Sequence, residues 1–336
     1  MKWNTKSLFT YLISVSISAL LFWYVYKDQN LAEMLERVGS ADLKWVLVSI
    51  VISMFSHLSR GIRWKIALKP LGYNVNTIKV FMAVVVGYFV NNLVPRMGEM
   101  ARCGLLKKGE GVPIRVSFGA VAAERALDLI LLVGLIATVL ILEFNKIGVF
   151  LSEKLTVTGA GMLSKLILLG GVGVFLIVFA LILYFQRHRL QSFTVYQKVG
   201  NLLSGFKEGL LSILKLSAVD RFYYIMHTLL IWVAYYFMAY VMFFCTPETS
   251  ILPPMTALTV LIMGGIGMAI PTPGGTGSYH LFVTATLLAY GISEPTGKYF
   301  AFLLHSSQVL SQIIFGSLFL LISLLWSKKP AYSNAG

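Results

Sequence analysis

The chain has 336 residues, of which 57% are hydrophobic and only 12% are charged. An average soluble protein is about 25% charged, so this composition excludes a soluble or disordered protein. The chain is nonetheless strongly basic, with 28 Lys and Arg against 14 Asp and Glu and a net charge of +14. Such a charge suits nucleic acid, an anionic membrane surface or an anionic substrate. The long apolar runs and the lack of a nucleic-acid-binding motif argue against the first.

Apolar runs of about 20 residues, long enough to cross a bilayer, recur along the chain. They predict six spanning helices, at 7–26, 44–68, 117–143, 162–185, 222–245 and 299–326. No small-residue cleavage site follows the first run, which therefore predicts a retained helix and not a signal peptide. The two cysteines, Cys103 and Cys245, are far apart and stand in no metal-binding pattern, so the sequence predicts neither a metal site nor a cofactor.

Two further apolar segments are short and are interrupted by proline and glycine. Segment 80–115 breaks at residues 95–98 (PRMG), and segment 254–292 breaks at residues 271–275 (PTPGG). An apolar segment that stops at such a break and then resumes as a helix is typical of a re-entrant hairpin. The sequence therefore predicts an all-α, polytopic membrane protein with six spanning helices and two re-entrant hairpins.

Most of the Lys and Arg residues fall in segments that would share one side of the membrane. The positive-inside rule makes that side cytoplasmic and places both termini there. The first hairpin then enters from the cytoplasm, and the second enters from the opposite face. Between them, the basic amphipathic stretch 186–221 predicts a linker lying on the anionic cytoplasmic leaflet.

The order of these elements repeats along the chain. We expect a single transmembrane domain over 1–336 with two similar halves, 7–143 and 162–326, each holding spanning helices and one hairpin. Because each element of the second half runs opposite to its counterpart, the arrangement predicts an inverted repeat, which is common in transporters.

Charged side chains at membrane depth are costly, so each is a candidate for function. Flexible glycines and a histidine at the second break join them. The candidate substrate-binding residues are Arg60, Arg63, Asn92, Arg96, Glu99, Arg102, Glu124, Arg125, Asp128, Gly274, Gly275, Gly277 and His280.

The first break combines a free cation with an acid. Glu99 and Arg102 are three residues apart and can pair on one helical face, whereas Arg96 has no local acid. A free guanidinium near helix N-terminal amides suits an anion, especially phosphate. The alternative is that these arginines only set the topology of a cytoplasmic loop.

Glu124 and Asp128 lie one helical turn apart and should repel each other unless a cation stands between them. Arg60, Arg63 or Arg96 could supply that cation. Such a network either shapes a headgroup cavity or relays protons, or it only locks helices together, and the sequence favours neither reading.

At the second break, the glycines expose backbone amides that an anion can bind. His280 follows them, and His305 lies in the last helix. Each histidine can relay a proton or can serve as a hydrogen-bonded structural residue.

Four motifs in combination resemble the lysylphosphatidylglycerol synthase transmembrane-domain (flippase-like) family: residues 92–102 (NLVPRMGEMAR), 111–113 (GVP), 124–128 (ERALD) and 271–277 (PTPGGTG). The resemblance covers nearly the whole chain and implies a polytopic inner-membrane protein that moves lipids or helps to handle them. Full synthases add an aminoacyl-transferase domain, which these residues lack, so lysyl transfer is not implied. Many members carry Glu where this chain has His280, so no acid is implied there.

We therefore expect a lipid flippase or transporter and not an enzyme. An anionic phospholipid or polyprenyl-phosphate-linked lipid would pass through a basic cavity between the two hairpins, without ATP because no ATPase motif is present. The expected partners are membrane lipids and their anionic headgroups, not nucleic acid. Two alternatives stay open: a membrane transferase acting on a lipid phosphate with Glu124 or Asp128 as base, or a scaffold for a separately encoded synthase or glycosyltransferase.

Overall fold

The computed structural model describes residues 5–143, 211 and 213–327. Within this part of the chain the fold is all-helical and contains no strand. The longer helices are α1 (Thr5–Tyr26), α2 (Leu31–Ser40), α3 (Leu43–Leu68), α4 (Thr77–Leu93), α5 (Gly98–Glu110), α6 (Ile114–Leu142), α11 (Ala218–Met242), α13 (Pro254–Ala269), α14 (Ser278–Ala289) and α15 (Glu294–Leu324). Short turns of helix are η1 (Lys69–Leu71), η2 (Phe243–Cys245), α12 (Pro247–Ser250) and η3 (Pro273–Gly275).

Four of the described helical stretches are long and apolar enough to cross a bilayer. They are Leu43–Leu71, Ile114–Leu142, Ala218–Cys245 and Glu294–Leu324. These match four of the six predicted spans. The first predicted span forms helix α1, whose apolar part, Tyr11–Tyr26, is shorter than the other four. The predicted span 162–185 and most of the predicted linker 186–221 lie outside the described residues.

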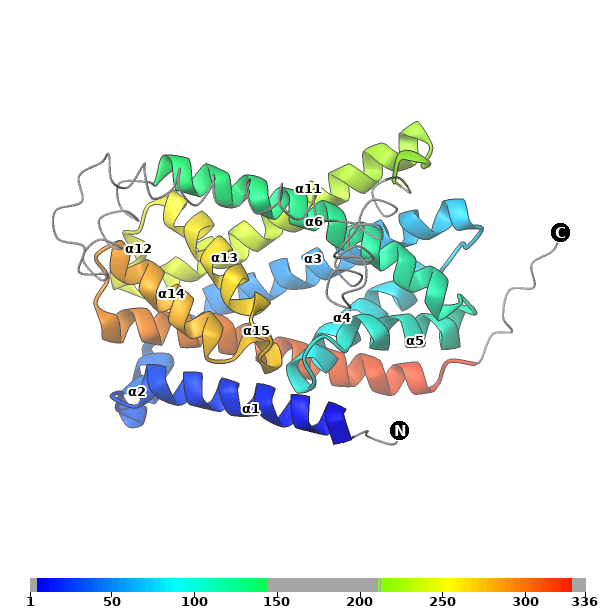
Figure 1. Cartoon of the computed structure of the whole chain (residues 1–336). Coiled ribbons are helices and arrows are strands. Elements are labelled where there is room, and N and C mark those ends of the chain that lie inside the picture. The colour runs from blue at the N-terminus through cyan, green and yellow to red at the C-terminus, as the bar shows by residue number, and fades with distance from the viewer. Residues whose placement is uncertain (1–4, 144–210, 212, 328–336) are drawn as a thin grey trace, which may run out of the picture.

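Both predicted breaks form turns between two helices. α4 packs along α5, and α13 packs along α14, so each pair forms a helical hairpin. Figure 1 shows that the two hairpins come from opposite ends of the molecule and that their turns meet near its middle. The turn element η3 of the second hairpin contacts α4 of the first. The sequence therefore located both turns correctly, and the fold brings them together.

The first turn is tight because glycine stands at its exit. Val94 ends α4 in an extended conformation, and Gly98 begins α5. Asn91 Oδ1 accepts a hydrogen bond from the Gly98 amide at 2.6 Å, which closes the turn. A side chain at Gly98 would collide with the backbone carbonyl of Gly87 on α4. Only glycine lets the two arms of this hairpin approach so closely.

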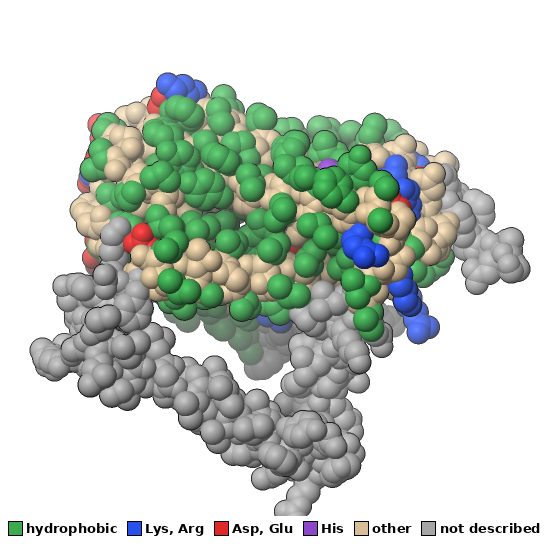
Figure 2. All heavy atoms as spheres, turned by 90° about the horizontal axis from the view of Figure 1, so that it is seen from above, with side chains coloured by type: hydrophobic (Ala, Val, Ile, Leu, Met, Phe, Trp, Pro, Cys, Tyr) green, Lys and Arg blue, Asp and Glu red, His purple; other side chains and the backbone are tan. Residues whose placement is uncertain are grey.

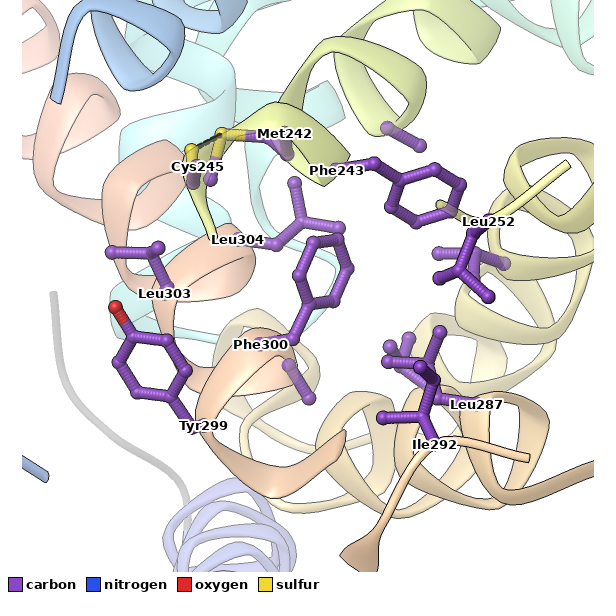
Figure 3. Close-up of a cluster of buried hydrophobic side chains, with 14 of the residues drawn as sticks. Met242, Phe243, Cys245, Leu252, Leu287, Ile292, Tyr299, Phe300, Leu303 and Leu304 are labelled. Atoms are coloured by element: carbon purple, nitrogen blue, oxygen red, sulfur yellow. Dashed lines mark hydrogen bonds between the residues drawn. The ribbon is translucent and has the colours of Figure 1, made fainter. Parts of the chain in front are cut away.

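Among the described residues the buried apolar side chains form three clusters, and the two largest lie at opposite ends of the molecule. Figure 3 shows one cluster, in which Phe243 and Phe300 lie with ring centroids 5.3 Å apart near Leu252 and Leu287. This cluster joins the end of α11 to α14 and α15. A second cluster at the other end is built from α3 to α6 around Trp64. The two clusters leave the hairpin turns and the polar groups between them.

The outer surface is largely apolar. Figure 2 shows one face on which hydrophobic side chains predominate and Lys and Arg lie near the ends. Val51 on α3 and Ile141 on α6 expose 68% and 76% of their surface, respectively. Large exposed apolar patches are unusual on soluble monomers, and they suit the surface of a protein that lies in lipid.

Candidate functional site

A network of buried charges lies where α3, α5 and α6 meet. Its members are Arg60 and Arg63 of α3, Arg102 of α5, and Glu124 and Asp128 of α6. All five are at least nine-tenths buried. Three arginines face two carboxylates, so the network carries a net positive charge. Burying unpaired charge is costly, so the pairing within this network is essential to its stability.

Asp128 is the acceptor that joins the two arginines of α3. Arg63 donates to both carboxylate oxygens of Asp128, at 2.7 and 3.1 Å, which is the bidentate geometry that arginine favours. Arg60 Nη1 donates to Asp128 Oδ2 at 3.1 Å and Nη2 donates to the Tyr235 hydroxyl at 2.9 Å. Thr228 of α11 accepts a further bond from Arg63 at 3.1 Å. Side chains of α11 therefore help to orient both guanidinium groups.

Glu124 extends the network to α5. Arg102 Nη2 donates to Glu124 Oε2 at 2.9 Å, and Arg63 Nε lies 3.8 Å from Glu124 Oε1. The Arg102 guanidinium also lies 4.6 Å from the centre of the Trp64 ring. Arg102 thus pairs with Glu124, not with Glu99 as the sequence spacing suggested, because α5 packs against α6. A cation does stand between Glu124 and Asp128, as predicted, and Arg63 supplies it.

The network borders a cavity of about 250 Å³, which we call the basic cavity. Arg60, Arg102 and Arg125 line it, together with Glu99 of the first hairpin. Arg125 is half-exposed and lies 3.5 Å from Asp128 Oδ2. Six of the predicted charged residues therefore gather in one place, with Glu99 at its edge. Tyr88 of α4 also lines this cavity, and its hydroxyl lies 3.1 Å from that of Tyr235.

Arg96 occupies a different position, between the two hairpin turns. It lines a cavity of about 150 Å³, the turn cavity, with Glu99 on one side and Gly274 and Gly275 on the other. Its side chain is exposed, and its φ is +64°. Among the described residues it is the one non-glycine with positive φ. An L-residue in this left-handed conformation is strained.

The glycines of the second turn serve mainly to shape the backbone. Gly274, Gly275 and Gly277 all have positive φ, and a side chain at Gly274 would lie 2.6 Å from Asn92 Oδ1. The Gly275 amide donates to the Thr272 carbonyl, and the Gly277 amide donates to a ring nitrogen of His280. These two amides are therefore occupied within the turn and are not free to bind an anion. Asn92 itself donates to Gln312 of α15 at 2.9 Å.

Both histidines are tied to this turn. His305 Nε2 donates to the Gly274 carbonyl at 2.8 Å, and His280 Nδ1 accepts from Gly277 at 3.1 Å. The His280 ring also packs against Phe22 and Tyr26 of α1. His280 and Gly277 thus lie against α1, away from the basic cavity, and their geometry matches the structural reading of the two histidines.

A third cavity, of about 310 Å³, lies beside the basic cavity, and we call it the apolar cavity. It is lined mostly by aromatic and aliphatic side chains of α11, α13 and α15, among them Trp232, Leu261 and Leu304. No sequence pattern singles out these residues, because an apolar side chain that lines a cavity has the same helical spacing as one that faces lipid. Tyr88 and Tyr235 were missed for the same reason.

The apolar helices and the buried charges define a multi-pass membrane protein whose polar side chains gather inside a helical bundle. The chain belongs to the family described as the lysylphosphatidylglycerol synthase TM region, which matches residues 11–316.

Individual relatives match over shorter stretches. The chain is similar to the UPF0104 membrane protein of Methanocaldococcus jannaschii, with 33% identity over 131 residues, which are 37% of each chain. A UPF0104 membrane protein of Pyrococcus horikoshii is 32% identical over 35% of this chain and 36% of its own. The glycosyltransferase AglD of Haloferax volcanii is 30% identical over 38% of this chain and 20% of its own. The chain thus spans well under half the length of each of these relatives. No solved structure matches it significantly.

Proposed function

We propose that the protein is a lipid flippase or transporter that moves an anionic phospholipid or a polyprenyl-phosphate-linked lipid across a bacterial inner membrane. One observation carries this proposal: two helical hairpins come from opposite ends of the molecule, and their turns meet beside a cavity lined by three arginines. Broken helices that meet at the midplane are the usual place for a transported ligand. Membership of a membrane-protein family supports the setting.

The proposed topology follows from the directions of the helices. The start of α1 and the end of α15 lie at the same end of the molecule (Figure 1). Lys69, Lys107 and Lys108 belong to segments that end there, so the positive-inside rule makes this end cytoplasmic. In this orientation both hairpins are re-entrant, the first from the cytoplasm and the second from outside. Six spans and an inverted repeat complete the proposed architecture.

The basic cavity would hold the phosphate of the headgroup. Arg60 and Arg102 are held by Asp128 and Glu124, respectively, so their guanidinium groups are oriented before a ligand arrives. Phosphate accepts hydrogen bonds from a guanidinium in a bidentate geometry that lysine cannot match. An incoming anion would also balance the net positive charge of the network. The hairpin turns on either side would then open in turn toward each leaflet.

Reconstitution in liposomes tests this proposal directly. Protein in vesicles that hold a fluorescent phosphatidylglycerol or polyprenyl phosphate should move the label between leaflets, as measured by quenching from outside. Arg125→Gln should slow this movement, because Arg125 lines the basic cavity, and its half-exposed ion pair with Asp128 should contribute little to stability. Lys107→Gln is the matched control, since it removes the same charge from an exposed position. Vesicles with protein that flip no anionic lipid faster than empty vesicles would refute the proposal.

A second candidate function rests on one relative, which is named a glycosyltransferase. The protein would then be a transferase acting on a lipid phosphate, or a scaffold for a separately encoded synthase or glycosyltransferase. The geometry gives the transferase little support, because Asp128 is engaged by two arginines and is poorly placed to act as a base. A covalently changed lipid after incubation with purified protein would favour the transferase, and a co-purifying enzyme would favour the scaffold.

A further inference from the structure

Met268 lies at a point where three cavities meet. It stands on α13, one residue before the end of that helix, and it lines the basic, turn and apolar cavities alike. Although it sits at the tip of a hairpin in the middle of the molecule, 49% of its surface is exposed. Its side chain therefore separates a charged space from an apolar one.

The apolar cavity has the size and lining of a ligand pocket. Its volume of about 310 Å³ is at the lower end of the range of about 300–1,000 Å³ that is typical of ligand pockets. Apolar cavities of about 150 Å³ already stay dry and take up small hydrocarbons. Leu261, Leu304 and Val309 supply aliphatic contacts in it, and Trp232 supplies an aromatic one. These side chains suit a hydrocarbon chain and not a phosphate.

Two residues form the wall that the basic and apolar cavities share: Tyr88 and Met268. Tyr88 is fixed, because its hydroxyl bonds to Tyr235 and its ring stacks on His57 at 4.3 Å. Met268 is unbranched, with three rotatable bonds, and such a side chain adapts readily to a new neighbour. Gly275 faces it, and a side chain there would collide with the Met268 sulfur. The mobile part of the wall is therefore Met268.

We infer that the basic and apolar cavities are two compartments of a single site for an anionic amphiphile, and that Met268 is the movable partition between them. The phosphate lies among the arginines, and the part of the chain nearest the headgroup passes Met268 into the apolar cavity. The rest of the chain stays in the bilayer. The chemical class of the ligand rests on the proposed function. The two-compartment site concerns only how a ligand binds, and it does not require that the protein transports the ligand.

Photo-crosslinking in detergent tests this inference. The probe is a phosphatidic acid that carries a diazirine near the start of one acyl chain, and mass spectrometry locates the label. We expect label on Trp232 and Val309, inside the apolar cavity, and competition by unlabelled phosphatidic acid. Label confined to Val233 and Phe237, exposed residues of α11 that do not line the cavity, would overturn the inference.

Two variants of the partition should act in opposite directions. Met268→Ala removes the partition and should tighten binding of the probe by about tenfold, the effect expected when a side chain no longer has to leave its preferred rotamer. Met268→Trp should fill the passage and abolish label inside the apolar cavity. The matched control is Met226→Trp, at an exposed position of α11, which should label like the unaltered protein. Equal labelling of both tryptophan variants, with no gain in Met268→Ala, would overturn the role of Met268.

Inorganic phosphate separates the two compartments. The dissociation constant of phosphate alone, measured directly by calorimetry, should be the same in the unaltered protein and in Met268→Ala, because the headgroup compartment is unchanged. A gain in phosphate binding equal to the gain for phosphatidic acid would overturn the inference, since Met268 would then act on the headgroup alone.

The labelling experiment and the liposome experiment can fail independently, so the two-compartment site and the proposed transport function are tested separately. Label inside the apolar cavity without movement of lipid in liposomes would support the two-compartment site and would refute the proposed transport function. Movement of lipid without such label would do the reverse.

Discussion

Replacing Asp128 by asparagine removes one of the two carboxylates that hold three buried arginines. Asp128 accepts two bonds from Arg63 and one from Arg60, and the side chains of those arginines are 0% and 4% exposed. Breaking a buried ion pair by removing one partner costs about 3–5 kcal/mol. Because asparagine keeps one acceptor oxygen, we expect Asp128→Asn to lower the free energy of unfolding by about 3 kcal/mol. Unfolding by SDS in mixed micelles, followed by circular dichroism, measures this loss.

The charge balance of the network also predicts a rescue. Adding Arg60→Met to Asp128→Asn removes a cation that has lost its partner, so the double variant should recover about half of the lost stability. Arg125→Gln is the control: its side chain is 46% exposed and 3.5 Å from Asp128, and exposed pairs are worth about 0–1 kcal/mol. A loss below about 1 kcal/mol in Asp128→Asn, or a double variant less stable than the single one, would refute the pairing argument.

Three further predictions concern the hairpin turns, and thermal unfolding in detergent tests each of them. Arg96→Gly should stabilise by up to about 1 kcal/mol because it relieves the left-handed backbone at φ +64°, and a gain of the same size in Arg96→Ala would contradict this reason. Gly98→Ala should destabilise by about 2 kcal/mol or more because its methyl group would collide with the backbone of α4. In the same helix Gly104→Ala has open space and should gain about 0.4–1 kcal/mol, so equal effects of the two changes would be contrary evidence. His305→Leu should cost about 1–3 kcal/mol by leaving the Gly274 carbonyl unpaired, and a neutral result would remove the histidine from its structural role.

The sequence located the turns because their causes are local. Proline disrupts the interior of a helix and glycine permits positive φ, so Pro95 and the glycines at 274–277 mark the breaks without knowledge of the fold. Arg96 is the exception: it occupies a left-handed position where local preference would place glycine. Only the surrounding structure can hold an arginine there.

The pairing of charges was only partly predictable. Spacing along one helix places Glu124 and Asp128 on one face, and it correctly requires a cation between them. Spacing along the helix also predicted that Glu99 would pair with Arg102. In the structure Arg102 pairs with Glu124, because α5 packs against α6. Partners on other helices depend on tertiary packing, which helical periodicity does not encode. For the same reason, the sequence does not predict that Met268 lies between two cavities.

The separation of the two largest apolar clusters bears on how the chain is made. The cluster around Trp64 draws its buried members only from residues between Trp64 and Val121, and the ion pairs of the network join residues 60–128. When the ribosome has released this stretch, the chain therefore already contains the residues of one core and the two carboxylates that pair with the arginines. Chains fold from the N-terminus during synthesis, so this half can settle in the lipid before α11 emerges. The other cluster, built mostly from α11 to α15, then adds the second hairpin, and only at that point do the cavities acquire their far walls.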